Sequence, residues 1–329
     1  MQRKHEHGLS AWLIGILAVA GLVVVVLRFG DLELFGRTLR HAHPLWLGGA
    51  LLLQVGTYCC VAAGWNAVLR KAKARQPFHR LLPIAITKLF ADQALPSAGL
   101  GGDVVLIDQL TGIGAPRPAA VAALLVSMVG NYLAYAALAV AMLVLLWFHG
   151  EATPWLVGLV TSFLLVALAI PSLALWLRSR GSQPLPARIE RIGPLARLLH
   201  IIGEAPPGLV ADRRLLGRVA SFNGLVFLAD AATLSLSLLA LGGPAAPAAA
   251  FIALMCASIV VTLAPIPLGL GGFEASCTAM LVLLGLPSSL ALAATLVFRG
   301  FSLWLPLLLG LAMLRRAANA RRRRAFPPA

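Results

Sequence analysis

The chain has 329 residues, of which 60% are hydrophobic and only 12% are charged. A soluble domain of this composition would have no interior large enough for its apolar side chains, so the sequence excludes a soluble protein and predicts an integral membrane protein. The formal net charge of +15 does not predict a nucleic-acid partner, because the basic residues are concentrated in a few segments between apolar runs.

Six apolar runs are long enough to cross about 30 Å of hydrocarbon as helices. They lie near 10–28, 45–69, 119–148, 153–177, 218–240 and 288–314. The first run follows Arg3 and Lys4 and continues without a small-residue cleavage site, so we expect it to be retained. We therefore expect residues 1–329 to form one all-α, multi-pass membrane domain.

The apolar region 81–112, between the second and third of these runs, is interrupted by the motif LPSAGLGGD. The motif contains Pro96, Gly101, Gly102 and Asp103. A break of this kind is costly in hydrocarbon unless it lines a cavity. The region therefore predicts a re-entrant helical hairpin, which leaves the membrane on the face where it entered.

A second motif, PIPLGLGGFE, interrupts the apolar region 246–286 in the same way. It contains Pro267, Gly271, Gly272 and Glu274, about 170 residues after the first motif. The same shift aligns 45–69 with 215–239 and 119–148 with 289–318, which predicts two repeats, 45–148 and 218–315, with one hairpin each. The alternative is chance, because glycine and proline are common in membrane helices.

Loop charges predict the orientation of both repeats. Basic residues are dense in 70–80, in the connector 178–217 and in the tail after 314, so these segments and both termini are expected in the cytoplasm. The first repeat then starts outside and the second inside, an inverted arrangement. Within the connector, 187–203 has the pattern of an amphipathic helix that contacts anionic lipid headgroups.

Several ionisable residues lie within apolar sequence and must pair or face water. Lys88 and Asp92 are four residues apart, so they can neutralise each other on one helix face, for structure or for transport. Asp103 and Glu274 each begin a half-helix, where a carboxylate either caps the helix or helps to bind an amine, a proton or a cation. The helix N-termini could alternatively hold a phosphate.

Arg299 lies too deep in the last apolar run to reach water from one end, so it needs a carboxylate or phosphate partner. Glu274 on the preceding hairpin is the nearest candidate. Two alternatives stay open, a purely structural Arg299–Glu274 pair and a pair that lines the cavity.

Motifs for catalysis or metal binding are missing from the sequence. The cysteines lie in apolar segments as small core residues, and the histidines His41 and His43 lack further ligands nearby. We expect no cofactor and no resident metal, and any enzymatic reaction would have to take place within the membrane.

The two motifs, together with RGFSLWLPLLLG at 299–310, resemble the flippase-like membrane region of the lysylphosphatidylglycerol synthase family, which includes stand-alone and hopanoid-biosynthesis-associated members. The resemblance implies lipid translocation. The soluble aminoacyl-transfer domain of bifunctional members is not expected, because the chain stops at Ala329. Arginines that members often carry are replaced by Leu106 and Phe273, which suits a less anionic lipid.

The leading hypothesis is a bacterial inner-membrane protein that moves a phospholipid or a polycyclic terpenoid lipid through a mid-membrane cavity. The alternatives are an intramembrane lipid-modifying enzyme and a scaffold for lipid-synthesis enzymes. Each of these three hypotheses is compatible with a homo-oligomer.

Overall fold

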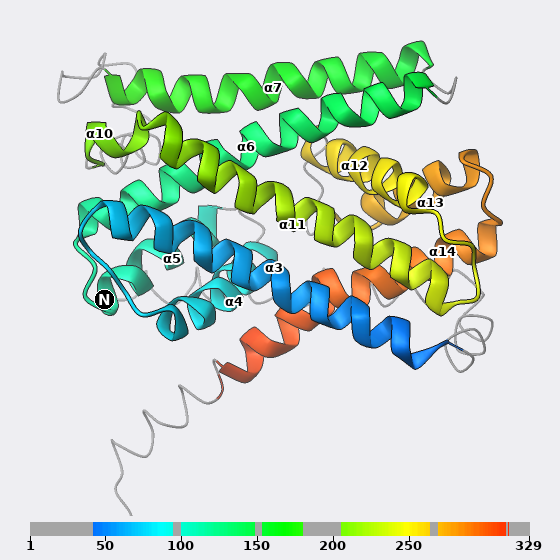
Figure 1. Cartoon of the computed structure of the whole chain (residues 1–329), viewed down its shortest axis with the longest axis horizontal. Helices are drawn as coiled ribbons and strands as arrows, with labels where there is room; N and C mark the ends of the chain where they lie inside the picture. Colours follow the sequence, from blue (N-terminus) through cyan, green and yellow to red (C-terminus); the bar gives the residue numbers. More distant parts are fainter. Residues whose placement is uncertain are drawn as a thin grey trace, which may run out of the picture. The chain divides into compact units, whose positions relative to one another are not determined.

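The structure is a computed structural model that describes residues 42–94, 100–148, 153–179, 205–263, 269–313 and 315. Throughout these ranges the regular elements are helices (Figure 1), which confirms the all-α prediction for the described part of the chain. The first predicted span, 10–28, and the predicted surface helix 187–203 lie outside it.

Within the described residues, four helices are long and apolar enough to cross a membrane. They are α3 (Pro44–Lys71), α6 (Arg117–Phe148), α11 (Arg213–Ala240) and the helix Ser288–Met313. They coincide with four of the predicted spans. A fifth, near 153–177, corresponds to helix α7 (Pro154–Ser179).

Each of the two interrupted apolar regions consists of two shorter helices. The first region forms α4 (Phe78–Ala94) and α5 (Leu100–Gly112), and the second forms α12 (Pro247–Leu263) and α13 (Gly272–Leu283). The helices therefore end and restart around the motifs, as predicted. Pro96 and Pro267 themselves lie outside the described residues.

The chain divides into two compact units. Unit 1 comprises Met1–Gln54, Ile86–Val105 and Asp230–Ala329, and unit 2 comprises Val55–Ala85 and Leu106–Ala229. Helices α3, α4, α5 and α11 contribute one end to each unit.

Unit 2 has a core of large apolar side chains packed among small ones. Trp65, Leu69 and Leu110 are fully buried there, beside a run of buried alanines in the first turns of α6. Helix α7 packs along α6 (Figure 1), with the rings of Tyr135 and Phe163 4.3 Å apart. The short helix α10 (Pro207–Val210) also contacts α6.

Asp212 begins α11 in unit 2. Its Oδ1 accepts hydrogen bonds from the backbone N–H groups of Arg214 at 2.9 Å and Leu215 at 3.1 Å, an N-terminal cap. Its Oδ2 lies 3.2 Å from Lys71 Nζ at the end of α3. These bonds and the cation lower the pKa of the Asp212 carboxyl below its ordinary value of 3.8.

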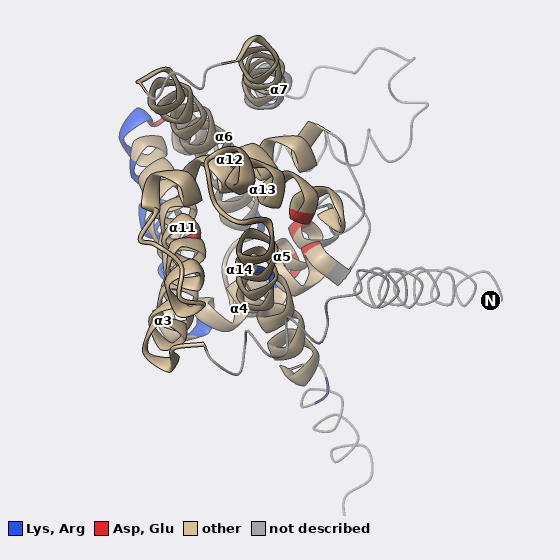
Figure 2. Ribbon diagram, turned by 90° about the vertical axis from the view of Figure 1, so that its right-hand side faces the viewer, with Lys and Arg blue, Asp and Glu red and all other residues tan. Residues whose placement is uncertain are grey.

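In unit 1, helix α12 packs against α13, and α13 packs against α14 (Ser288–Arg299). Buried small side chains on these helices include Cys256 on α12 and Cys277 on α13. A hydrogen bond joins α3 to α11 in the same unit: Gln54 Nε2 donates to Asp230 Oδ1 at 2.6 Å. Figure 2 shows that few acidic residues lie in the described helices.

The last span is not a uniform α-helix. After α14 the chain forms one π-helical turn, η3 (Gly300–Trp304), in which the Leu305 N–H bonds to the Gly300 carbonyl five residues back. The helix then continues to Met313. There Gly310 lies so close to Phe90 that a Cβ at this glycine would overlap the phenylalanine. The sequence predicted an uninterrupted span and missed the π-turn.

Candidate functional site

The charged residues of both motifs fall in unit 1, and the second motif forms the more enclosed cluster. Helix α13 begins directly after Gly271, whose φ of 80° lies in the left-handed region that L side chains rarely adopt. This conformation turns the backbone so that the Gly271 N–H donates a 2.7 Å hydrogen bond to Glu274 Oε2. Glu274 therefore caps its own helix from the first turn.

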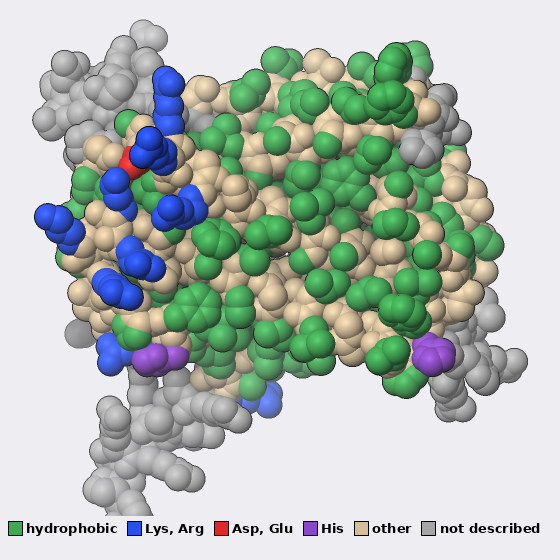
Figure 3. Space-filling view, viewed as in Figure 1, with side chains coloured by type: hydrophobic (Ala, Val, Ile, Leu, Met, Phe, Trp, Pro, Cys, Tyr) green, Lys and Arg blue, Asp and Glu red, His purple; other side chains and the backbone are tan. Residues whose placement is uncertain are grey.

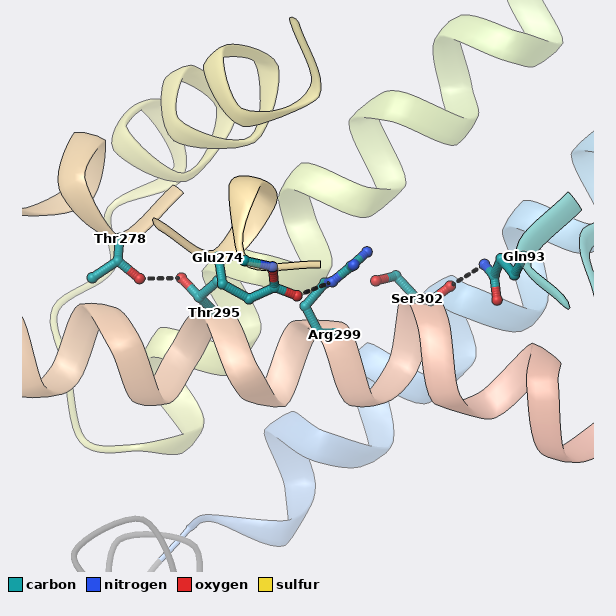
Figure 4. A network of polar contacts seen from close by, with 7 residues as sticks. Gln93, Glu274, Thr278, Thr295, Arg299 and Ser302 are labelled. Carbon is teal, nitrogen blue, oxygen red and sulfur yellow. Dashed lines mark hydrogen bonds and ion pairs between the residues drawn. The ribbon is translucent and has the colours of Figure 1, made fainter. Parts of the chain in front are cut away.

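The other carboxylate oxygen of Glu274 holds Arg299. Arg299 Nε donates to Glu274 Oε1 across 2.6 Å (Figure 4), and their side chains are only 12% and 14% exposed. The prediction that Glu274 is a partner of Arg299 is thus confirmed. One carboxylate therefore serves both as a helix cap and as the partner of a buried guanidinium.

Aromatic rings complete the surroundings of this ion pair. The Arg299 guanidinium carbon lies 4.9 Å from the centre of the Phe273 ring, and Phe273 stacks on Phe298 with ring centres 5.8 Å apart. A cation over a ring face is attracted by the π electrons. Phe273 therefore places an aromatic face, not a second positive charge, beside Arg299.

Neutral polar groups extend the cluster along the last span in both directions (Figure 4). On one side, Thr278 Oγ1 and Thr295 Oγ1 are 3.5 Å apart. On the other side, the Gln93 amide nitrogen donates to the Ser302 carbonyl oxygen at 3.2 Å, joining α4 to η3. Sequence reasoning missed Gln93 and Ser302. The only available signal was that each is a polar residue in apolar sequence.

The first motif forms a cluster of three charged groups. Lys88 Nζ lies 2.7 Å from Asp92 Oδ2 and 3.3 Å from Asp103 Oδ1, with side-chain exposures of 19%, 24% and 29%. The expected Lys88–Asp92 pair is present, and Asp103 joins it from the first turn of α5. One ammonium shared by two carboxylates leaves a negative charge in excess.

The start of α5 is in close contact with α4 at Gly102. A Cβ at Gly102 would overlap the Asp92 carboxylate and lie 2.9 Å from the Lys88 carbonyl oxygen. Asp92 therefore lies against the N-terminal turn of α5, which begins at Leu100 and includes Gly101. A carboxylate already occupies the positive end of this helix, which disfavours a phosphate there.

The two clusters differ in charge balance. Glu274 and Arg299 neutralise each other, whereas Lys88 cannot neutralise both Asp92 and Asp103. Over the residues that the structure describes, no three histidine, cysteine or acidic side chains form a metal-binding group.

The family described as the lysylphosphatidylglycerol synthase TM region matches residues 12–310. The matched stretch includes both motifs, Lys88 and Arg299. No curated protein matches the chain.

Proposed function

Since the chain belongs to the lysylphosphatidylglycerol synthase TM region family, a membrane family linked to lipid handling, we propose that it translocates an amphipathic lipid between leaflets. The cargo would be a phospholipid or a polycyclic terpenoid lipid. Its polar end would pass the motif clusters while its apolar part stays in the hydrocarbon.

The observation that carries this proposal is the Glu274–Arg299 pair at the broken end of α13. Ionisable groups at membrane depth are expensive, and they usually mark a pathway for a polar substrate. Transporters of several folds use broken helices in this way, because a helix end supplies backbone groups that a continuous helix keeps for itself. The cluster at Lys88 repeats the arrangement at the other break.

Two inverted repeats with re-entrant hairpins are part of the proposal. The helix lengths support it: α3, α4, α5 and α6 have 28, 17, 13 and 32 residues. The corresponding series α11, α12, α13 and the last span has 28, 17, 12 and 26. Helices of 12 to 17 residues are short for a full crossing, which favours hairpins that return to one face.

The proposed location is the cytoplasmic membrane of a bacterium, with both termini and the basic loops in the cytoplasm. Exposed basic side chains gather at one end of unit 2, where α3 ends and α11 begins (Figure 3). They are Arg70, Lys71, Lys73, Arg75, Arg80, Arg213, Arg214 and Arg218. This positive surface would contact anionic lipid headgroups.

The test is a leaflet-resolved assay with the purified protein in vesicles. Lipids with labelled headgroups are placed in one leaflet, and their transfer is followed by a reagent that cannot cross the membrane. Transfer should be faster than in protein-free vesicles. Transfer at the protein-free rate for phospholipids and polycyclic terpenoids alike would refute the proposal.

A change in total lipid species, with unchanged distribution between leaflets, would favour an intramembrane enzyme instead. Neutralising Asp103 and Glu274 without any effect on phenotype would favour a scaffold.

A further inference from the structure

The hydroxyl of Ser302 lacks the partner that hydroxyls in these helices usually have. Thr262 and Thr295 donate to the carbonyl four residues back, at 2.8 Å each. Ser302 lies in the π-turn, where the backbone register is changed. Its Oγ is buried and has no hydrogen-bond partner among the described residues.

Gln93 carries a second buried atom without a partner. Its Nε2 donates to the Ser302 carbonyl, and since a carbonyl only accepts, the amide oxygen must lie on the other side. Gln93 Oε1 is also buried without a hydrogen-bond partner among the described residues. Gln93 and Ser302, which are hydrogen-bonded to each other, thus each carry one buried polar atom without a hydrogen bond among the described residues.

Both residues adjoin the ion pair of the second motif. Figure 4 shows the Ser302 hydroxyl pointing toward the Arg299 guanidinium, with Gln93 on its far side. A buried polar atom without a hydrogen bond lowers stability, and two of them on hydrogen-bonded residues call for partners supplied from outside. π-turns of this kind are frequent at functional sites.

We propose that Gln93 Oε1 and Ser302 Oγ form a subsite for hydroxyl groups of the lipid headgroup, one at each atom. This inference rests on the proposed function, because a headgroup reaches the subsite only if the lipid enters this site. Gln93 Oε1 can only accept, so the headgroup must donate a hydrogen bond. Ser302 can donate in return. A hydroxyl can donate to Gln93 Oε1 and can accept from Ser302, whereas an ammonium cannot accept the Ser302 proton.

The experiment compares two lipids that differ only in hydroxyls. Labelled phospholipids with a glycerol or a propanol headgroup carry the same charge, and only the first has hydroxyls to offer. We expect wild-type protein in vesicles to move the glycerol-headed lipid roughly fivefold faster, the effect of one buried hydrogen bond. Ser302→Ala and Gln93→Met should bring the ratio of rates toward one, because the glycerol-headed rate falls more than the propanol-headed rate.

A matched control is Thr262→Val, which removes a hydroxyl in the same unit that already has a partner, and which should keep the ratio. Ser302→Ala removes a group without a partner, so it should fold even if Gln93→Met does not. Equal wild-type rates for the two lipids, or a preference that survives Ser302→Ala, would overturn the subsite.

A second pair of lipids tests whether the donor is a hydroxyl or an N–H group. Ethanolamine-headed lipid has N–H donors and choline-headed lipid has none. If the variants lose a preference for ethanolamine over choline but keep the preference for glycerol over propanol, the hydroxyl assignment is overturned. Wild-type protein that moves none of the four lipids would exclude phospholipids as the cargo and overturn the headgroup subsite. Failure with polycyclic terpenoids as well would refute the proposed function.

Discussion

Arg299 Nε and Glu274 Oε1 are 2.6 Å apart and join the last span to the first turn of α13. The two residues are separated by 25 positions in sequence, and each is largely shielded from solvent. Removing one partner of a pair so enclosed leaves the other charge buried and unpaired, so variants of the two residues should differ clearly in stability.

Removing one partner of this pair should destabilise the protein more than removing both charges. Arg299→Ala leaves a buried carboxylate without its cation, and we expect a loss of about 3–5 kcal/mol. The double variant Glu274→Gln, Arg299→Gln should recover most of that stability, because no charge remains buried. Thermal unfolding in detergent measures both.

Lipid transfer by the same variants separates structure from function. If the double variant regains stability but not transfer, the charges serve the cargo. Full transfer by a stable double variant would show that the pair is purely structural.

Lys88→Met should be more harmful than Asp103→Asn. Without Lys88, both Asp92 and Asp103 lose their cation, whereas Asp103→Asn leaves the 2.7 Å Lys88–Asp92 pair intact. We expect the free energies of unfolding to differ by about 2 kcal/mol or more. Equal losses would mean that Lys88 does not serve both carboxylates.

Gly102→Ala should disturb the contact between α4 and α5. The new methyl group would overlap Asp92, an overpacking that costs about 1–3 kcal/mol. Gly112→Ala in the same helix is the matched control, because nothing lies within 4 Å of a Cβ there. Unfolding midpoints that fall equally for both variants would contradict the close approach.

The cap of α11 should make stability depend on pH in the acid range. The pKa of Asp212 is lowered by folding, so its stabilising effect is full above about pH 4 and is lost as the pH falls through the folded pKa. The unfolding midpoints of wild type and Asp212→Ala should therefore differ at pH 6 and converge in strong acid. A difference that is constant with pH would exclude a role for the ionised carboxylate.

The long helices could be predicted from sequence because each needs only a run of apolar residues. The breaks at the two motifs followed from glycine and proline, and the Lys88–Asp92 pair from a spacing of four. The Arg299–Glu274 pair followed from the rule that a buried charge needs a partner, since one candidate was near.

Contacts between distant segments could not be predicted in the same way. Asp230 accepts a hydrogen bond from Gln54, which is 176 residues away and carries no charge that would indicate the contact in the sequence. The contact of Asp92 with Gly102 depends on how α4 meets α5. The π-turn adds one residue to a turn, and a pattern of apolar residues is too coarse to reveal it.

A π-turn holds one residue more than an α-turn, so the extra residue in Gly300–Trp304 is taken up within that turn. Deleting one residue there would restore an ordinary α-turn and leave Gly310 facing Phe90. The same deletion after Trp304 would rotate the segment up to Met313 by about 100° and put Leu311 in the place of Gly310, where no side chain fits. The last span can therefore lose a residue at the π-turn and keep this contact, but not in the helix that follows.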